Sequence, residues 1–217
     1  MNRKTIGRIM TGVAAILLLP ACNGIFEGIY DMPTSATGNE YGFILIDEGA
    51  RTGRIYIDAT NYTEWHYVDL RGKQVTTTQV GDAAPETWDF AVHRYDTKTN
   101  GGTVCESQTG SFEALPAPGT VAEDQWVADE WTTDRITIDL SQMMNGVIRH
   151  AEDYWNPCLS RWLNVDTSTM PPIYTLSGKI YLLRLKDGTC AALRLANFMN
   201  DAGVKGYMTI DYLYPVE

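Results

Sequence analysis

The chain has 217 residues and a formal net charge of -10 at pH 7. With 44% hydrophobic and 20% charged residues, its composition is that of a globular protein and excludes a largely disordered chain. Its length fits one large domain or two small ones. Because an acidic surface repels phosphate, we expect no nucleic-acid partner.

The N-terminal segment has the pattern of an export signal. Arg3 and Lys4 precede an apolar run at residues 13–19, which is too short to cross a membrane as a helix. The run leads into LPAC at residues 19–22, which is similar to a bacterial lipobox, so we expect lipidation of Cys22. An ordinary signal peptide with an incidental cysteine is the alternative. The expected organisation is a lipoprotein signal peptide at 1–21, a lipidated tether at 22–37 and a β domain at 38–217.

Three further cysteines remain, namely Cys105, Cys158 and Cys190. In an exported chain they permit one disulfide and one free thiol, and the pattern does not select the pair. No C-x-x-C motif occurs, which argues against a zinc ribbon or a thioredoxin-type site.

The body of the chain predicts β-strands. Short segments alternate apolar and polar residues, are rich in β-branched and aromatic side chains, and are bounded by Gly, Asn and Asp. We expect a single, predominantly antiparallel all-β domain with little helix, and a hairpin turn at Lys186-Asp187-Gly188. The expected strands cover residues 42–46, 54–58, 63–69, 88–92, 135–140, 179–185, 189–197 and 207–212.

Residues 141–172 form the longest segment without a clear strand pattern. A short helix within 147–162 is compatible with the sequence, although Pro157 interrupts it. A connection of this length inside a compact domain is usually functional. Met143, Met144 and Met170 bracket it, and they are either hydrophobic loop anchors or metal ligands.

Catalytic motifs are not evident in the sequence. It contains no G-x-S-x-G elbow, no P-loop and no H-E-x-x-H helix, and only three histidines. We read His66 and His93, both within strand patterns, as structural. We expect that the protein is not an enzyme; an exported hydrolase with an unrecognised site is the minority alternative.

Two segments resemble the HmuY family of haem-binding lipoproteins. They are WDFAVHRYDTKTNGG at residues 88–102 and YTEWHYVDL at residues 62–70. The resemblance implies an all-β fold with long ligand-bearing loops that hold haem between two axial ligands. The founding pattern uses two histidines, but His150 has no second histidine after it. Relatives that use two methionines are the better match.

The resemblance then implies Met170 as one axial ligand and either Met143 or Met144 as the other. If His150 were a ligand, its partner would be Met170. A thioether is a soft, neutral ligand that raises the potential of haem iron relative to imidazole. Between the methionines, Trp155 and Trp162 are candidate walls for the porphyrin, as is Tyr154, and Arg149 or Arg161 is a candidate partner for the propionates.

We therefore expect a haemophore that is anchored by lipid in the outer membrane, at the cell surface or released from it. It would take haem, as cargo, from host haemoproteins and deliver it to a TonB-dependent outer-membrane haem receptor. The alternative is a surface glycan- or protein-binding β-sandwich lipoprotein that uses its tryptophans as stacking platforms.

Overall fold

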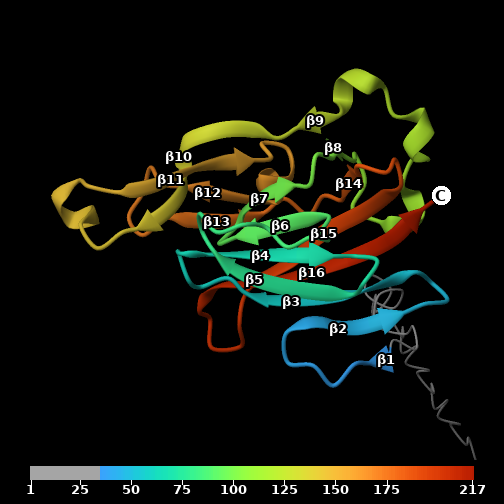
Figure 1. Cartoon of the computed structure of the whole chain (residues 1–217), viewed down its shortest axis with the longest axis horizontal. Helices are drawn as coiled ribbons and strands as arrows, with labels where there is room; N and C mark the ends of the chain where they lie inside the picture. The colour runs from blue at the N-terminus through green and yellow to red at the C-terminus, as the bar shows by residue number, and fades with distance from the viewer. Residues whose placement is uncertain (1–34) are drawn as a thin grey trace, which may run out of the picture. The chain divides into compact units, whose positions relative to one another are not determined.

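Residues 35–217 are described by the structure, a computed structural model. The predicted signal peptide and Cys22 lie outside these residues. Every strand pairing in the described range is antiparallel. The strands form an eight-stranded sheet, a four-stranded sheet and two separate hairpins (Figure 1). The predicted antiparallel all-β fold is therefore confirmed.

The eight-stranded sheet joins the two ends of the described chain. Its order is β1 (Ser35–Ala36), β2 (Gly42–Asp47), β3 (Thr52–Asp58), β16 (Lys205–Val216), β15 (Cys190–Met199), β14 (Tyr181–Arg184), β8 (Thr103–Glu106) and β9 (Val127–Ala128). The C-terminal strand β16 lies in the middle of this sheet, between β3 and β15. It therefore joins the N-terminal strands to the rest of the sheet.

The four-stranded sheet and the hairpins use the rest of the strands. The sheet has the order β5 (Gln74–Gln79), β4 (Glu64–Asp69), β6 (Phe90–His93) and β7 (Asp96–Thr99). One hairpin pairs β10 (Glu130–Asp139) with β11 (Arg149–Trp155), and the other pairs β12 (Leu163–Asp166) with β13 (Ile173–Leu176). Short 3-10 segments are η1 (Phe112–Ala114), η2 (Pro118–Thr120), η3 (Glu123–Gln125), η4 (Met143–Asn145) and η5 (Leu159–Trp162).

The two larger sheets bury a common hydrophobic core. Ile55 and Ile57 of β3 alternate with outward-facing residues, as the two-residue period of a strand requires. They join the same core cluster as Val68 of β4 and Phe90 and Val92 of β6. Each such side chain contributes about 1.5–3 kcal/mol on burial, so this contact between the sheets is a main source of stability.

Within residues 88–102, Arg94 and His93 have structural roles. Arg94 adopts a positive φ of 53° between β6 and β7, and its Nη1 donates hydrogen bonds to the carbonyl oxygens of Ala59 and Thr60 at 3.1 and 2.9 Å. Gly206, with φ +107°, lies against the Arg94 guanidinium, where a Cβ would overlap it. His93 is fully buried and bonds to the carbonyl of Tyr62 at 2.8 Å, and burial lowers its pKa to about 4.

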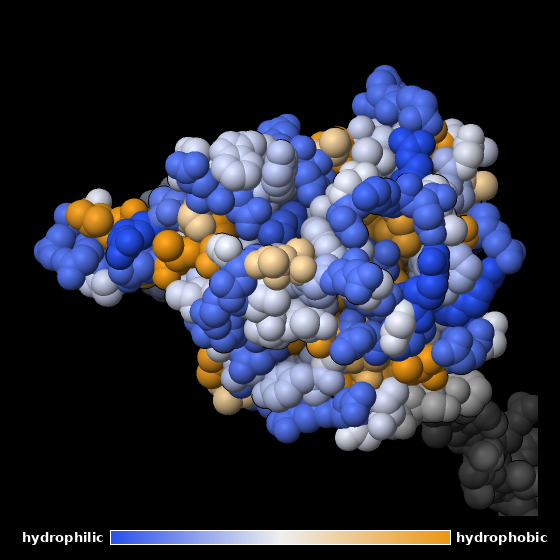
Figure 2. Space-filling view, in the orientation of Figure 1, coloured by the Kyte–Doolittle hydropathy of each residue, from blue (hydrophilic) through white to orange (hydrophobic). Residues whose placement is uncertain are grey.

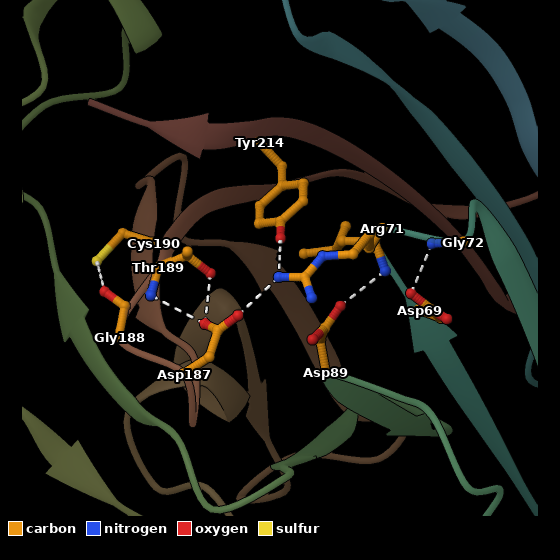
Figure 3. A network of polar contacts seen from close by, with 10 residues as sticks. Asp69, Arg71, Gly72, Asp89, Asp187, Gly188, Thr189, Cys190 and Tyr214 are labelled. Atoms are coloured by element: carbon orange, nitrogen blue, oxygen red, sulfur yellow. Dashed lines mark hydrogen bonds and ion pairs between the residues drawn. The ribbon is translucent and has the colours of Figure 1, made fainter.

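A polar network links the turns at one end of the two sheets (Figure 3). The Asp89 carboxylate accepts a hydrogen bond from the backbone N–H of Leu70 at 2.7 Å. The Arg71 guanidinium, in the β4–β5 turn, pairs with Asp187 of the β14–β15 turn at 2.6 Å and donates to Tyr214 of β16 at 3.2 Å. The network therefore connects the four-stranded sheet to the eight-stranded sheet.

The structure confirms the expected strands and corrects the expectation for residues 141–172. In the predicted turn, the Leu185 N–H donates to the Thr189 carbonyl at 2.8 Å. The segment at 141–172, however, contains β11 and β12, and its only helical turns are η4 and η5. The sequence of β11, RHAEDYW, shows no clear alternation of apolar and polar residues, because it carries charged or polar residues on both faces.

The three cysteines of the described residues are free and buried, so no disulfide forms among Cys105, Cys158 and Cys190. Within residues 35–217 no helix is both long enough and apolar enough to cross a membrane.

Candidate functional site

The three predicted methionine ligands lie on the loops of the two hairpins. Met143 and Met144 form η4 at the tip of the β10–β11 hairpin, and the turn closes on Gly146 in the left-handed conformation with φ 76°. Met170 lies in the loop that connects β12 to β13. In Figure 1 both hairpins extend toward the same side of the β domain, at the left of the view.

All three methionine side chains are exposed to solvent. The exposed fraction is 40% for Met143, 90% for Met144 and 76% for Met170. In contrast, Met208 in β16 is fully buried and fills the core. A methionine that anchors a loop must bury its side chain, so the loop-anchor interpretation has little support for Met144 and Met170.

Exposed apolar side chains are concentrated on the same two hairpins. Among the described residues, ten large hydrophobic side chains are strongly exposed, and eight of them are on β10–β11 or β12–β13. A concentration of this kind marks a binding surface, whereas single exposed hydrophobic residues are ordinary. Figure 2 shows apolar surface on the same projection. We call this set the hairpin apolar surface: Trp131, Met143, Met144, Val147, Ile148, Tyr154, Met170 and Ile173.

The β10–β11 hairpin has an outward and an inward face. Trp131 pairs with Tyr154 on the outward face, where the rings make an edge-to-face contact with centroids 5.1 Å apart. Ile136 and Trp155 face inward and pack in the cluster that contains Trp65 of the four-stranded sheet. The structure therefore presents Tyr154 to solvent and keeps Trp155 half-buried beneath the hairpin, with Arg135 over its ring.

The root of the β10–β11 hairpin is attached to β7 by buried polar contacts. The Asp129 carboxylate accepts hydrogen bonds from the backbone N–H and the hydroxyl of Thr99 at 2.7 and 3.0 Å. The Asn156 side chain donates to the same carboxylate at 2.9 Å. Farther along the hairpin, Lys98 of β7 pairs with Asp153 of β11 at 2.8 Å.

The same strand holds the root of the second hairpin. The backbone N–H of Thr97 donates to the Ser160 hydroxyl of η5 at 3.0 Å. The indole N–H of Trp162 donates to the Tyr95 carbonyl at 2.8 Å, and the ring is fully buried in the main core. Trp162 thus supports the root of β12 and is not brought to the surface with the methionines.

Arg149 and His150 begin β11, next to the methionine-bearing turn. Arg149 is exposed and lies opposite Asp139 in the hairpin register. His150 is half-buried, and its Nδ1 lies 3.3 Å from the hydroxyl of Thr137 on the neighbouring strand. Arg161, in η5, pairs with Glu106 of β8 at 3.7 Å. Of the two arginines predicted as propionate partners, Arg149 is therefore the one beside the methionines.

Sequence reasoning missed four apolar members of this surface, namely Trp131, Val147, Ile148 and Ile173. The available signal was the position of Val147 and Ile148 directly after the Asn145-Gly146 turn, where polar residues are usual. Among residues 35–217, no group of three or more His, Cys, Asp or Glu side chains is arranged to hold a metal ion.

The family model described as "HmuY protein" matches residues 61–212. A candidate lipoprotein from Bacteroides fragilis is 51% identical, with 84% of this chain and 100% of that chain covered and a TM-score of 0.78. A candidate HmuY-like haem-binding protein from Bacteroides vulgatus is 52% identical, with coverage of 82% and 100% and a TM-score of 0.76.

The apo HmuY analogue of Tannerella forsythia, at 24% identity, is similar in fold, with 76% of this chain and 97% of that chain covered and a TM-score of 0.63. Among curated proteins, none matches the chain. Because the family model covers more than half of the residues and two solved structures share half of the sequence over nearly the whole described domain, the chain belongs to the HmuY family.

Proposed function

We propose that this protein binds haem as cargo, without catalysing a reaction on it, through the thioether of Met170 and that of Met143 or Met144. The observation that carries the proposal is the exposure of three methionines within the hairpin apolar surface. The relative from Bacteroides vulgatus, described as a candidate haem-binding protein, supports the same ligand.

The chemistry of the exposed side chains suits haem. A thioether is a weak, neutral, soft donor, so it binds best to a metal that already has other ligands. Haem iron arrives with four porphyrin nitrogens and needs only two axial ligands. The porphyrin faces are apolar, and the exposed aromatic and aliphatic side chains of the two hairpins would cover them. Arg149 would pair with a propionate.

Of the two tryptophans predicted as porphyrin walls, Trp155 is half-buried beneath the β10–β11 hairpin, and Trp162 supports the β12 root. We therefore propose that Trp155 lies below the site and that Tyr154 and Trp131 make the direct aromatic contacts.

A haem titration tests the ligands. We expect the dithionite-reduced protein to give the sharp Soret and Q bands of six-coordinate low-spin haem. Met170→Leu should remove this spectrum, and separate Met143→Leu and Met144→Leu variants should show which of the two is the ligand. Because Leu and Met have similar volumes and these sites are exposed, folding should be unaffected. Met199→Leu in β15 is the matched control.

Two outcomes would contradict the proposal. One is a wild-type protein that gives no low-spin spectrum with haem. The other is a low-spin spectrum that survives each of the three methionine substitutions in turn and the triple variant. Mild peroxide treatment before haem addition should also abolish binding, because methionine sulfoxide no longer presents a thioether.

The cellular part of the proposal is a lipid-anchored carrier in the outer membrane. Lipidation of Cys22 is supported by the LPAC motif and by the description of the relative from Bacteroides fragilis as a candidate lipoprotein. The carrier would take haem from host haemoproteins and pass it to a TonB-dependent receptor. Labelling cells with radioactive palmitate should mark the wild-type protein and not Cys22→Ala.

The glycan-binding alternative depends on exposed tryptophans. Of the six tryptophans, all within the described residues, only Trp131 is largely exposed, at 55%. A row of stacking platforms is therefore not formed, and the haem proposal is favoured.

A further inference from the structure

We infer that Lys98 and Asp153 are positioning residues that determine where the β10–β11 tip stands relative to Met170. Neither belongs to the hairpin apolar surface, so they would act through the methionines and not by touching haem. The inference rests on the proposed haem function.

The Lys98–Asp153 pair is buried and directional. The Lys98 ammonium lies 2.8 Å from the Asp153 carboxylate, and the side chains are only 10% and 20% exposed. The same ammonium lies 4.2 Å from the centroid of the Trp65 ring and 5.3 Å from that of Tyr67. An ion pair that is largely shielded from water, and whose ammonium lies over two aromatic rings, has one preferred geometry.

This pair matters because the hairpin has no ladder of hydrogen bonds to another sheet. Within residues 35–217, β10 and β11 pair only with each other, and β7 belongs to the four-stranded sheet. Hydrogen bonds of Asp129 hold the root of the hairpin. Beyond the root it is held by the Lys98–Asp153 pair and by the packing of Ile136, Ala151 and Trp155 on the cluster around Trp65. Of these, only the ion pair is strongly directional.

The tip beyond these contacts is unsupported. Residues 141–149 are all exposed, and Ile136 is the last fully buried residue of β10. The end of β10 lies opposite Arg149, and the four residues of β11 from Asp153 to Arg149 span roughly 13 Å at about 3.3 Å per residue. A rotation of about 5° at the ion pair would move the end of the hairpin by about 1.1 Å, whereas a metal site tolerates about 0.2 Å.

Replacement of the pair by apolar residues separates positioning from stability. Removing one partner leaves a buried charge and destabilises the protein, but replacing both by apolar side chains of similar size is often neutral. We therefore expect the double variant Lys98→Met, Asp153→Leu to keep a melting temperature close to that of the wild type. Its haem affinity should fall by about 10-fold or more, the effect typical of residues that orient metal ligands.

The spectrum provides the readout that a purely structural role would not change. Well below its melting temperature, the double variant should show part of the haem as five-coordinate and high-spin. The separate variant Lys98→Arg, which retains the charge pair, should keep the low-spin form of the wild type. The matched control is Arg184→Met, Glu123→Leu, which removes an ion pair of 2.9 Å between β14 and η3 and should leave haem binding unchanged.

The outcomes separate the two proposals. If wild-type protein does not bind haem, the proposed function fails. If it binds, and the folded double variant matches its affinity and spectrum, the positioning role alone is refuted. Should the double variant unfold, Lys98→Met with Asp153→Asn, which leaves no buried charge and keeps the shape of the Asp153 side chain, is measured in the same way: unchanged affinity and spectrum refute the inference, and a weakened, partly high-spin complex supports it.

Discussion

Replacing Asn156 by alanine tests whether the junction of the two hairpins is a main source of stability. Asn156 is fully buried, and its side chain makes four hydrogen bonds. The amide nitrogen donates to the Val127 carbonyl at 3.2 Å and to the Asp129 carboxylate at 2.9 Å. The amide oxygen accepts from the backbone N–H groups of Cys158 and Leu159 at 3.1 and 2.8 Å.

The size of the effect follows from the partners that are left behind. Each buried group that loses its hydrogen bond costs about 1–3 kcal/mol, and relaxation or entering water recovers part of this. We expect the free energy of unfolding to fall by about 4 kcal/mol, a large part of the 5–15 kcal/mol of a typical domain. For a domain of this size that corresponds to a drop of about 12 °C in melting temperature.

Thermal unfolding of the apo protein, followed by circular dichroism, measures the effect directly. Asn145→Ala is the matched control, because Asn145 is exposed at the hairpin tip and its side-chain amide donates to the exposed Gln142 side chain at 2.8 Å. The control should shift the melting temperature by no more than about 2 °C. A shift of similar size for Asn156→Ala would refute the assignment of the junction as a stability centre.

Three further predictions concern buried residues outside the proposed site. Burial raises the pKa of Asp96 to about 7, although Arg135 opposes this, so the folded state holds the proton more tightly than the unfolded state and stability falls as pH rises from about 4 to 7. Asp96→Asn should therefore raise the melting temperature at pH 8 and have little effect near pH 4; an equal effect at both would contradict it. Gly206→Ala should lower the melting temperature by several degrees, because its φ is +107° and the new Cβ would overlap Arg94, and an unchanged value would be inconsistent with this contact. The three cysteines of the described domain are buried, and burial raises their pKa, that of Cys158 to about 11, so they should react with a thiol reagent at pH 7.5 only after denaturant is added.

The local features of this protein are determined by its sequence. Alternation of apolar and polar residues predicts strands such as β3, and Lys186-Asp187-Gly188 predicts the turn that joins β14 to β15, because both depend on neighbouring residues. The methionines could also be singled out, since Met143, Met144 and Met170 stand in connections where polar residues are expected. All three side chains are exposed in the structure. The haem titration tests whether they are ligands.

Only the tertiary structure decided which side chains reach the surface beside those methionines. Alternation along β11 places Ala151 and Trp155 on one face and Tyr154 on the other. Which face turns inward is decided by packing, because Ala151 and Trp155 contact the cluster around Trp65 while Tyr154 stays exposed. The hairpins are anchored on β7 and on Tyr95, the residue before it. These anchors join residues 55 and 67 positions apart, Lys98 with Asp153 and Tyr95 with Trp162. Such contacts form only when the sheets pack together, so they cannot be predicted from the local sequence.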